Sequence, residues 1–304
     1  MRVFVTGATG FVGSAMVKEL ISAGHQVLGL ARSHAAAKSV VAAGGEVHRG
    51  SLEDLESLRR GTAAADGVIH TAFTHDFNNY GSAAEADRRA IEILGCELAG
   101  SDRPFIVTSG TLIVKPGGLL ATEEDEATPN FPRQSEAAAL ALLARGARVS
   151  VLRLPPSVHG NGDHGFVPRL IGIAREKGVS AYIGEGLNRW AAAHRLDAAR
   201  LYRLVLENRS AGGRYHAVAD EGVPTREIAE VIGRRLNLPV VSKSPQDAAD
   251  HFGWIARFFS MDGPASSAKT QEQLGWRPVQ PGLIADLDAE HYFEHTAEAV
   301  ALRA

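Results

Sequence analysis

The chain has 304 residues, of which 45% are hydrophobic and 22% charged, so it is long enough for one large α/β domain and too apolar to be disordered. Its formal net charge of −3 excludes a strongly basic surface for nucleic acid or an anionic membrane. We therefore expect a small molecule as the partner of this protein.

The single cysteine and the hydropathy of the sequence indicate in which cellular compartment the protein is expected. Cys96 is the single cysteine, so an internal disulfide is excluded, and its helical surroundings predict a small buried residue. The sequence begins with MRVFVTGATG, which lacks the long apolar run of a secretory leader. No segment approaches the ~18 consecutive apolar residues of a membrane span. We expect a cytoplasmic protein.

The first half alternates short apolar runs with helical patterns, which predicts a parallel sheet wrapped by helices. The expected strands are 2–7, 25–32, 46–50, 67–73, 104–109 and 147–154. The expected helices are 11–24, 34–43, 53–60 (with Ser51 as its N-cap), 82–99 and 134–145. Six β-α steps predict an α/β doubly wound parallel sheet, the Rossmann fold.

The pattern loosens after Pro155 and Pro156. Helical segments near 166–177, 195–208 and 224–236 alternate with short strands such as 213–219. We interpret residues 1–155 as a dinucleotide-binding domain to which 195–220 returns. Residues 156–194 and 221–304 are then a smaller C-terminal α+β region that binds the substrate.

A glycine motif lies between the first expected strand and helix, with Gly7, Gly10 and Gly13 in GATGFVG. Residues without a Cβ allow a tight turn and a close approach of backbone amides to a pyrophosphate, which the helix N-terminus also attracts. The alternative is a glycine turn that only packs helix against strand. The expected cofactor contacts are Gly7, Thr9, Gly10, Phe11, Val12, Gly13, Arg32, Ser33, Ser51, Leu52, Ala72, Phe73, Thr74, Thr108 and Pro155.

The end of the second strand indicates which dinucleotide binds. An NAD site usually places an acid there for the ribose 2′-hydroxyl, but no Asp or Glu occurs between Glu19 and Glu46. Arg32 and Ser33 follow this strand instead, and a guanidinium with a hydroxyl suits a 2′-phosphate. Unless Arg32 is an ordinary surface residue, NADP(H) is favoured over NAD(H).

Several segments together resemble the extended and atypical short-chain dehydrogenases/reductases, nearly from end to end. They include VTGATGFVG, VIHTAF, FIVTSG, RLPPSVHGNGDHGFVPRL and SAKTQEQLGWRP. The resemblance implies a mechanism in which a tyrosine, assisted by a lysine four residues later, donates a proton while hydride moves to a carbonyl carbon. A serine polarises the carbonyl oxygen.

The sequence departs from that pattern. Pro132 and Glu136 stand at the positions that match the tyrosine and the lysine, with Ser135 between them, and no tyrosine of the chain has a lysine four residues later. Gly110 stands at the serine position, flanked by Ser109 and Thr111. The closest resemblance is to atypical members that keep the fold and lose the tyrosine–lysine pair.

Other side chains are candidates for the missing roles. Ser109 or Thr111 would donate a hydrogen bond to the developing alkoxide, although Ser109 is equally suited to contact the nicotinamide or cap a turn. His75, His164 and Tyr182 are candidate proton donors.

The remaining charged residues predict one ion pair and no metal site. Arg133 and Glu136 are spaced to pair with each other, and a carboxylate at the lysine position would raise the pKa of a neighbouring acid. His159, Asp163 and His164 lack metal-ligand spacing, so we expect no metal.

The leading interpretation is an NADPH-dependent reductase of a small carbonyl compound (ketone, aldehyde or imine) with a non-standard proton donor. The alternative is an NADP(H)-binding redox sensor without turnover. A nucleotide-sugar epimerase or dehydratase ranks third, because such enzymes also need the tyrosine. By analogy, helices 82–99 and 134–145 would pair two subunits in a homodimer.

Overall fold

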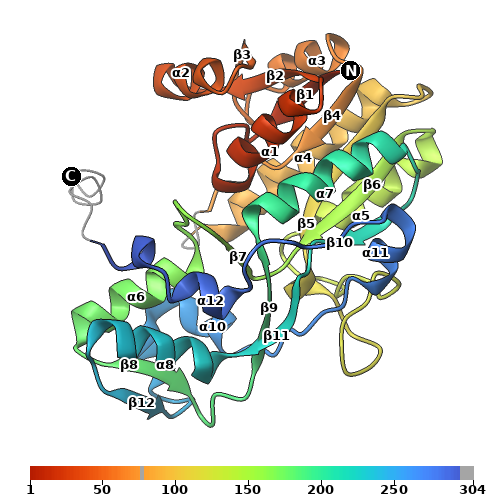
Figure 1. Cartoon of the computed structure of the whole chain (residues 1–304). Helices are drawn as coiled ribbons and strands as arrows, with labels where there is room; N and C mark the ends of the chain where they lie inside the picture. Colours follow the sequence, from red (N-terminus) through yellow and green to blue (C-terminus); the bar gives the residue numbers. More distant parts are fainter. Residues whose placement is uncertain (76–78, 295–304) are drawn as a thin grey trace.

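The computed structural model describes residues 1–75 and 79–294. Seven parallel strands form the main sheet, in the order β10-β6-β5-β4-β1-β2-β3 (Figure 1). Their bounds are β1 (Arg2–Thr6), β2 (Gln26–Ala31), β3 (Glu46–Arg49), β4 (Gly67–His70), β5 (Pro104–Gly110), β6 (Arg148–Leu154) and β10 (Arg214–His216). The chain runs outward from β1 to β3 and then returns to β4, which is the doubly wound arrangement. The predicted Rossmann fold is confirmed.

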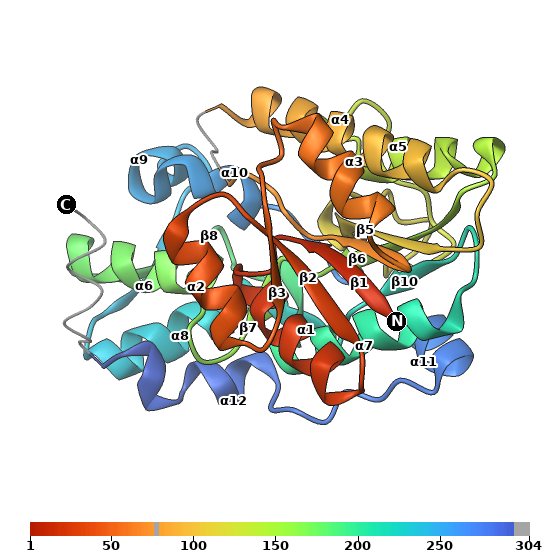
Figure 2. The ribbon, with the colours of Figure 1, turned by 90° about the horizontal axis from the view of Figure 1, so that it is seen from above.

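Helices cover both faces of this sheet. Figure 2 shows α3 (Leu55–Ala63), α4 (Tyr80–Leu98) and α5 (Ser135–Ala141) on one face and α1 (Phe11–Ser22) and α7 (Arg195–Asn208) on the other. The remaining helix of the first half, α2 (His34–Ala42), begins where the Ser33 hydroxyl accepts a hydrogen bond from the Ala36 amide at 3.1 Å.

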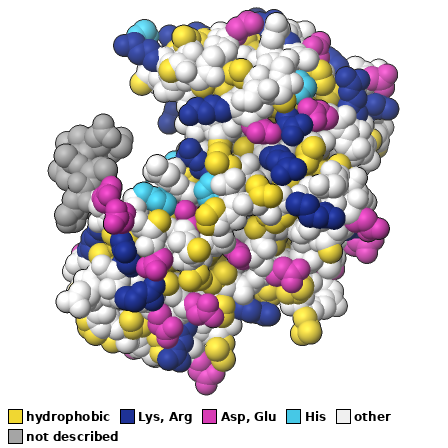
Figure 3. All heavy atoms as spheres, viewed as in Figure 1, with side chains coloured by type: hydrophobic (Ala, Val, Ile, Leu, Met, Phe, Trp, Pro, Cys, Tyr) yellow, Lys and Arg dark blue, Asp and Glu magenta, His cyan; other side chains and the backbone are white. Residues whose placement is uncertain are grey.

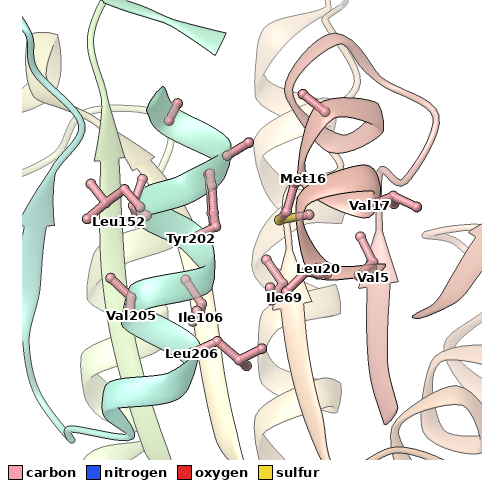
Figure 4. Close-up of a cluster of buried hydrophobic side chains, with 14 of the residues drawn as sticks. Val5, Met16, Val17, Leu20, Ile69, Ile106, Leu152, Tyr202, Val205 and Leu206 are labelled. Atoms are coloured by element: carbon pink, nitrogen blue, oxygen red, sulfur yellow. The ribbon is translucent and has the colours of Figure 1, made fainter. Parts of the chain in front are cut away.

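The core between the sheet and the α1/α7 face is apolar (Figure 4). It contains Val5, Ile69, Ile106 and Leu152 of the strands, Met16, Val17 and Leu20 of α1, and Tyr202, Val205 and Leu206 of α7. Each large apolar side chain enclosed here contributes roughly 1.5–3 kcal/mol. The Tyr202 hydroxyl, a polar group in this core, is satisfied by Thr108 Oγ1 at 2.7 Å.

The C-terminal part lies beyond the carboxyl ends of the main strands (Figure 1). It contains a three-stranded sheet of β7 (Ser157–His159), β9 (Arg189–His194) and β11 (Asp220–Pro224), and the pair β8 (Ser180–Ile183) and β12 (Val240–Lys243). Its helices are α6 (Phe166–Lys177), α8 (Thr225–Leu236), α9 (Ala248–Phe252), α10 (Ala256–Phe259) and α12 (Leu283–Leu287), while α11 (Ala268–Leu274) contacts β10. Four 3₁₀ turns, η1 (Thr111–Ile113), η2 (Leu143–Arg145), η3 (Gly253–Ile255) and η4 (Glu290–Tyr292), complete the described elements.

The segment 195–220 returns from the C-terminal part to the main sheet. Helix α7 packs against α1, and β10 pairs with β6 in parallel. The chain therefore leaves the Rossmann fold after β6, builds β7 to β9, and rejoins it before finishing the C-terminal part.

Three local predictions were wrong. Ser51 is not the N-cap of the third helix, because α3 begins after Asp54, whose Oδ1 accepts the Ser57 amide hydrogen at 3.0 Å. Cys96 is exposed rather than buried, since it lies on the outer side of α4 with Arg145 Nη1 3.0 Å from its Sγ. Helix α5 ends at Ala141 and is followed by η2, and Gly146 (φ 77°) turns the chain into β6.

Across residues 1–75 and 79–294, none of the helices combines the length and the apolar character that a membrane crossing requires.

Candidate functional site

The glycine loop between β1 and α1 has the geometry of a phosphate cradle. Gly7 has a φ of 74°, and a Cβ there would lie 2.6 Å from Thr71 Oγ1, while a Cβ at Gly13 would lie 1.9 Å from the Gly7 carbonyl oxygen. A Cβ at Gly10, by contrast, would meet only the Gly7 oxygen, at 3.3 Å, among the described residues. Gly7 and Gly13 therefore permit close packing, and Gly10 leaves the loop open to a ligand.

The N-terminus of α1 opens onto this cradle. The first intrahelical bond runs from the Ser14 amide to the Gly10 oxygen (2.8 Å), so the three preceding amides have no acceptor within the helix. Arg195, at the start of α7, places its guanidinium 4.9 Å from the centre of the Phe11 ring, and the His164 ring lies 5.7 Å from the same ring. These residues fit a pyrophosphate, because amides, helix dipole and a guanidinium all converge there.

The adenosine end of the predicted cofactor site lies at the ends of β2 and β3. Arg32 and Ser33 are exposed, and Arg49 donates a hydrogen bond from Nη1 to the Ser33 carbonyl at 2.8 Å. Ser51 Oγ accepts a hydrogen bond from the Glu53 amide (3.3 Å). A side-chain hydrogen bond from Ser51 lowers the pKa of the Glu53 carboxyl, with a smaller contribution from Arg32. The site thus presents two guanidiniums and one carboxylate to the expected ribose.

The segment after β4 reaches the cradle from the other side. Thr71 Oγ1 donates to the Thr6 carbonyl (2.8 Å), and the Ala72 amide donates to Thr6 Oγ1 (3.3 Å). The half-buried Phe73 and the exposed Thr74 follow at the edge, and Leu52 is half-buried after β3. Pro155 is buried directly after β6. Thr108, which was also predicted to contact the cofactor, turns its hydroxyl inward to Tyr202 and to the His70 carbonyl.

The end of β5 has an open position between two enclosed hydroxyls. A Cβ at Gly110 would meet only the Leu154 carbonyl oxygen, at 3.7 Å, among the described residues, so this position leaves room for a ligand. Ser109 and Thr111 are each 2% exposed, and neither hydroxyl has a hydrogen-bond partner in the part of the chain that the structure describes. Ser109 lies beside Arg153 of β6 in the sheet register.

Arg133 brings a positive charge to this edge of the sheet. Its Nη2 donates to the Thr108 carbonyl (3.1 Å), its Nε donates to Ser135 Oγ (2.8 Å), and its guanidinium lies 4.1 Å from the centre of the Phe73 ring. Its Nη1 makes no hydrogen bond to any described residue. The side chain is 15% exposed, so the guanidinium is fixed by the protein and still faces the outside.

The expected Arg133–Glu136 pair does not form, and that prediction was wrong. Glu136 is 2% exposed and points into the protein, where Arg153 binds both its oxygens at 2.8 and 2.6 Å. Arg214 also donates to Glu136 Oε1 at 2.8 Å. Glu136 therefore carries no charge to the cofactor edge, and the expected effect of its carboxylate on a catalytic acid falls away.

His75 and Tyr80 lie around Arg133. The His75 ring lies 5.3 Å from Phe73, and loss of surrounding water, followed by the charges of Arg133 and His164, lowers its pKa below 6.5. The Tyr80 ring lies 5.7 Å from Phe73, and burial raises its pKa. At neutral pH His75 is therefore mostly neutral, and Tyr80 is a protonated phenol.

Tyr182, a candidate proton donor, lies apart from the residues around Arg133, and so do His159 and Asp163, which were not expected to bind a metal. Tyr182 belongs to β8, where its ring packs against Gly186 and the Arg226 guanidinium lies 5.4 Å away, so its use as a proton donor is not supported. His159 Nδ1 contacts Asp286 (2.8 Å), and Asp163 accepts from Gly165 N and from the Tyr292 hydroxyl. Among residues 1–75 and 79–294, no three His, Cys, Asp or Glu side chains gather to hold a metal ion.

Figure 3 shows a hollow on this face of the molecule, between the N-terminal elements and the part that holds α6 and α12. Histidine and basic side chains border it. Sequence reasoning had missed Arg133 as a site cation, Tyr80, Arg195 and the buried Asp87. The stretch TAFTHDFNNY contains Tyr80, but no local pattern marks the other three, because they reach the site from separate helices and loops.

Comparison with known proteins shows that this chain is an NAD(P)-dependent oxidoreductase, which uses a nicotinamide dinucleotide as its cofactor. Residues 3–94 match the family described as the NAD dependent epimerase/dehydratase family. The chain is 30% identical over 263 residues to a 2-alkyl-3-oxoalkanoate reductase of Stenotrophomonas maltophilia, a match that covers 80% of this chain and 78% of that protein. The chain belongs to the NAD-dependent epimerase/dehydratase family, the extended short-chain dehydrogenases/reductases.

One further sequence relative and one solved structure are similar to this chain. The chain is 52% identical to an uncharacterized protein of Schizosaccharomyces pombe over 295 residues, which is 96% of this chain and 100% of that one. A crystal structure of the dTDP-glucose 4,6-dehydratase DesIV from Streptomyces venezuelae, with NAD bound, superposes with a TM-score of 0.76 at 21% identity over 95% of both chains. At this identity the second similarity supports the fold alone.

Proposed function

We propose that the protein is an NADPH-dependent reductase that converts a small ketone, aldehyde or imine to the corresponding alcohol or amine. The observation that carries the proposal is the position of Arg133, whose guanidinium is held beside the ends of β4 and β5 with Nη1 unengaged by described residues. A reduction builds negative charge on the carbonyl oxygen, and a preorganised cation there stabilises the transition state.

The residues present fit the cofactor. The amides at the start of α1 and Arg195 would hold the pyrophosphate, and the open position at Gly110 would receive the nicotinamide end. When bound, NADPH supplies the hydride and leaves as NADP⁺. The carbonyl π bond breaks as a C–H bond forms, and the oxygen takes up a proton.

Arg133 and His75 have different roles at the carbonyl oxygen: Arg133 stabilises its negative charge, and His75 donates the proton. Arg133 stays protonated and cannot serve as the acid, so it orients and stabilises the oxygen through Nη1. His75, charged in a fraction of molecules, releases a proton from a ring nitrogen to the new alkoxide.

The choice of NADPH is supported by the end of β2. Arg32 and Ser33 stand exposed there, and the N-terminus of α2 adds partial positive charge for a 2′-phosphate. We expect Arg32→Ala to weaken NADPH binding by roughly 10- to 100-fold, as loss of a charge-assisted bond would. The affinity for NADH, measured in parallel by fluorescence titration, should change by no more than about threefold. Equal losses for both cofactors would contradict NADP specificity.

The name of the 2-alkyl-3-oxoalkanoate reductase gives that relative a carbonyl substrate that also carries a carboxylate. We therefore include 3-oxo acids in the substrate panel, beside aldehydes, ketones, diketones and cyclic imines. Consumption of NADPH is followed by its absorbance, with NADH in parallel, for the wild type, Arg133→Lys and Arg133→Gln. Turnover that survives with lysine and collapses with glutamine supports the proposal.

The runner-up function is a redox sensor that binds NADP(H) without turnover. Tight NADPH binding with no turnover across the panel would favour this alternative and reject the reductase. Interconversion of nucleotide sugars in the same assays, followed by chromatography of the products, would favour epimerase or dehydratase chemistry.

A further inference from the structure

A buried aspartate lies behind the site cation. Asp87, on α4, is 1% exposed, and its carboxylate faces three groups. His70 Nε2 is 3.2 Å from Oδ1, Ser135 donates its hydroxyl hydrogen to Oδ2, and Arg133 Nη2 lies 3.7 Å from Oδ1. A carboxylate enclosed to this degree needs such partners, because an unpaired buried charge is strongly unfavourable.

The contacts form one continuous chain to Arg133. Ser135 Oγ accepts a hydrogen bond from Arg133 Nε (2.8 Å) and passes its own hydrogen to Asp87, so the serine bridges the two charges. The position of Nη2 is then fixed by the Thr108 carbonyl (3.1 Å). Two of the three guanidinium nitrogens are thereby restrained on the Asp87 side, and Nη1 is turned away from it.

The same carboxylate is tied to the cofactor cradle. The other ring nitrogen of His70, Nδ1, lies 2.8 Å from Thr6 Oγ1, and that oxygen also accepts the Ala72 amide hydrogen. Thr6 directly precedes Gly7 of the glycine loop. Asp87 thus connects Arg133 with the ends of β1 and β4, the strands that present the cofactor loop.

The charge of Asp87 is maintained in the fold. Burial acts to raise the pKa of this carboxyl, but Arg133, His70 and Ser135 together outweigh burial and lower it. At neutral pH Asp87 is therefore an anion that attracts the guanidinium of Arg133.

We propose that Asp87 is a positioning residue that holds the guanidinium of Arg133 in the reaction site, through the Ser135 bridge and through its charge. The proposal rests on the proposed function, in which Arg133 stabilises the carbonyl oxygen. Asp87 itself touches neither substrate nor cofactor in this arrangement. A purely structural role for Asp87 predicts loss of stability without any change at Arg133.

The direct test observes Arg133 in the protein without cofactor. The Nε–H signal of Arg133 in ¹⁵N–¹H correlation spectra is assigned as the peak lost in Arg133→Lys. We expect that peak to shift and to exchange faster with water in Asp87→Asn, and in Ser135→Ala as a second variant in case the first fails to fold. An unchanged peak in both variants overturns the proposal.

Kinetics provide the second test. Misplacing a catalytic group by about 1 Å costs up to about 100-fold in rate, so we expect kcat of Asp87→Asn to fall by that order while the KM for NADPH stays near the wild-type value. Methylguanidine should restore turnover to Arg133→Ala when Asp87 is present and fail to restore it in Arg133→Ala/Asp87→Asn. Equal rescue in both backgrounds overturns the proposal.

Asp197→Asn is the matched control. Asp197, in the first turn of α7, is also 1% exposed. Its carboxylate accepts hydrogen bonds from the backbone amides of Val279 (3.1 Å) and Gln280 (3.0 Å). This variant should lose stability and leave the Arg133 peak in place. If the wild type reduces nothing on the panel, the proposed function fails, while the Arg133 spectra still decide whether Asp87 holds the guanidinium.

Discussion

Two arginine–carboxylate pairs flank helix α5, and they are built differently. In the first, Glu136 is bound by Arg153 through two hydrogen bonds, and both side chains are at most 2% exposed. Arg153 also donates to the carbonyls of Thr122 and Asp125 and contacts His216. All the nitrogens of this guanidinium are engaged inside the protein.

The second pair is looser. Arg133 lies 3.7 Å from Asp87 rather than in direct hydrogen bonding, is 15% exposed, and keeps Nη1 unengaged by described residues. The comparison teaches that burial of a charge pair does not by itself mark a functional site. A closed pair fixes the fold, whereas a pair with one free donor at a strand end retains a group that can act on a ligand.

The largest expected effect is a loss of turnover when Arg133, the arginine of the looser pair, is replaced. Arg133→Gln should lower turnover by about 100- to 1,000-fold, the loss typical of removing one transition-state donor. Its unfolding free energy should fall by less than half of the loss in Arg153→Met, because Asp87 keeps His70 and Ser135 as partners. Steady-state kinetics and urea unfolding of both variants check this, and a larger stability loss in Arg133→Gln would break the comparison.

The closed pair should respond in stability. Arg153→Met leaves Glu136 with Arg214 as its remaining cationic partner among the described residues. We therefore expect a loss of about 3 kcal/mol, at the lower end for a broken buried pair. The double variant Arg153→Met/Glu136→Leu should recover much of that loss, because no buried charge then remains unpaired. Urea unfolding measures both, and a loss under about 1 kcal/mol in the single variant would contradict the closed arrangement.

The closed pair also predicts a pH dependence. Burial and the neighbouring Arg153 lower the pKa of His216 from 6.5 to about 4. The unfolded chain therefore binds a proton between these values that the folded protein does not, so stability falls as pH drops from 6.5 toward 4, by up to about 1.4 kcal/mol per pH unit. Unfolding between pH 4.5 and 7 should show this slope, and His216→Asn should flatten it.

The smallest expected effect concerns the open position at Gly110. Its φ of −135° suits any residue and a Cβ meets little, so Gly110→Ser should change stability by no more than about 0.5 kcal/mol. Gly13→Ser is the control, because its Cβ would overlap the Gly7 carbonyl, and calorimetry should report a strongly destabilised protein.

The order of elements and the glycine loop were predictable from the sequence because both depend on short-range patterns. Apolar periodicity located the seven strands of the main sheet and the flanking helices to within a few residues. The spacing of Gly7, Gly10 and Gly13 predicted the phosphate-binding loop between β1 and α1. The observed ends of the helices differed from the predicted ones where the hydrogen bond of a particular side chain set the end. Asp54 displaced Ser51 as the N-cap of α3 because its carboxylate reaches the Ser57 amide.

The candidate site was less predictable because its members come from distant segments. Spacing alone suggested that Arg133 pairs with Glu136, yet Arg133 lies before the first turn of α5 and turns to β5, while Glu136 turns to Arg153 of β6. The partner of each charge is set by tertiary contacts: Arg133 donates to Thr108, 25 residues away, and Glu136 accepts from Arg153, 17 residues away. A single sequence carries no local signal for such contacts.

The place of β10 decides whether the first half of the chain can stand alone. β10 and the residues on either side of it cover the edge of β6. The Gly213 carbonyl accepts from the Val151 amide, and the Ala217 amide donates to the Arg153 carbonyl. A fragment ending at residue 155 would expose that edge, next to the fully enclosed Val149 and Val151. Uncovered apolar edges recruit other chains, so such a fragment, although it holds the whole glycine cradle, should aggregate.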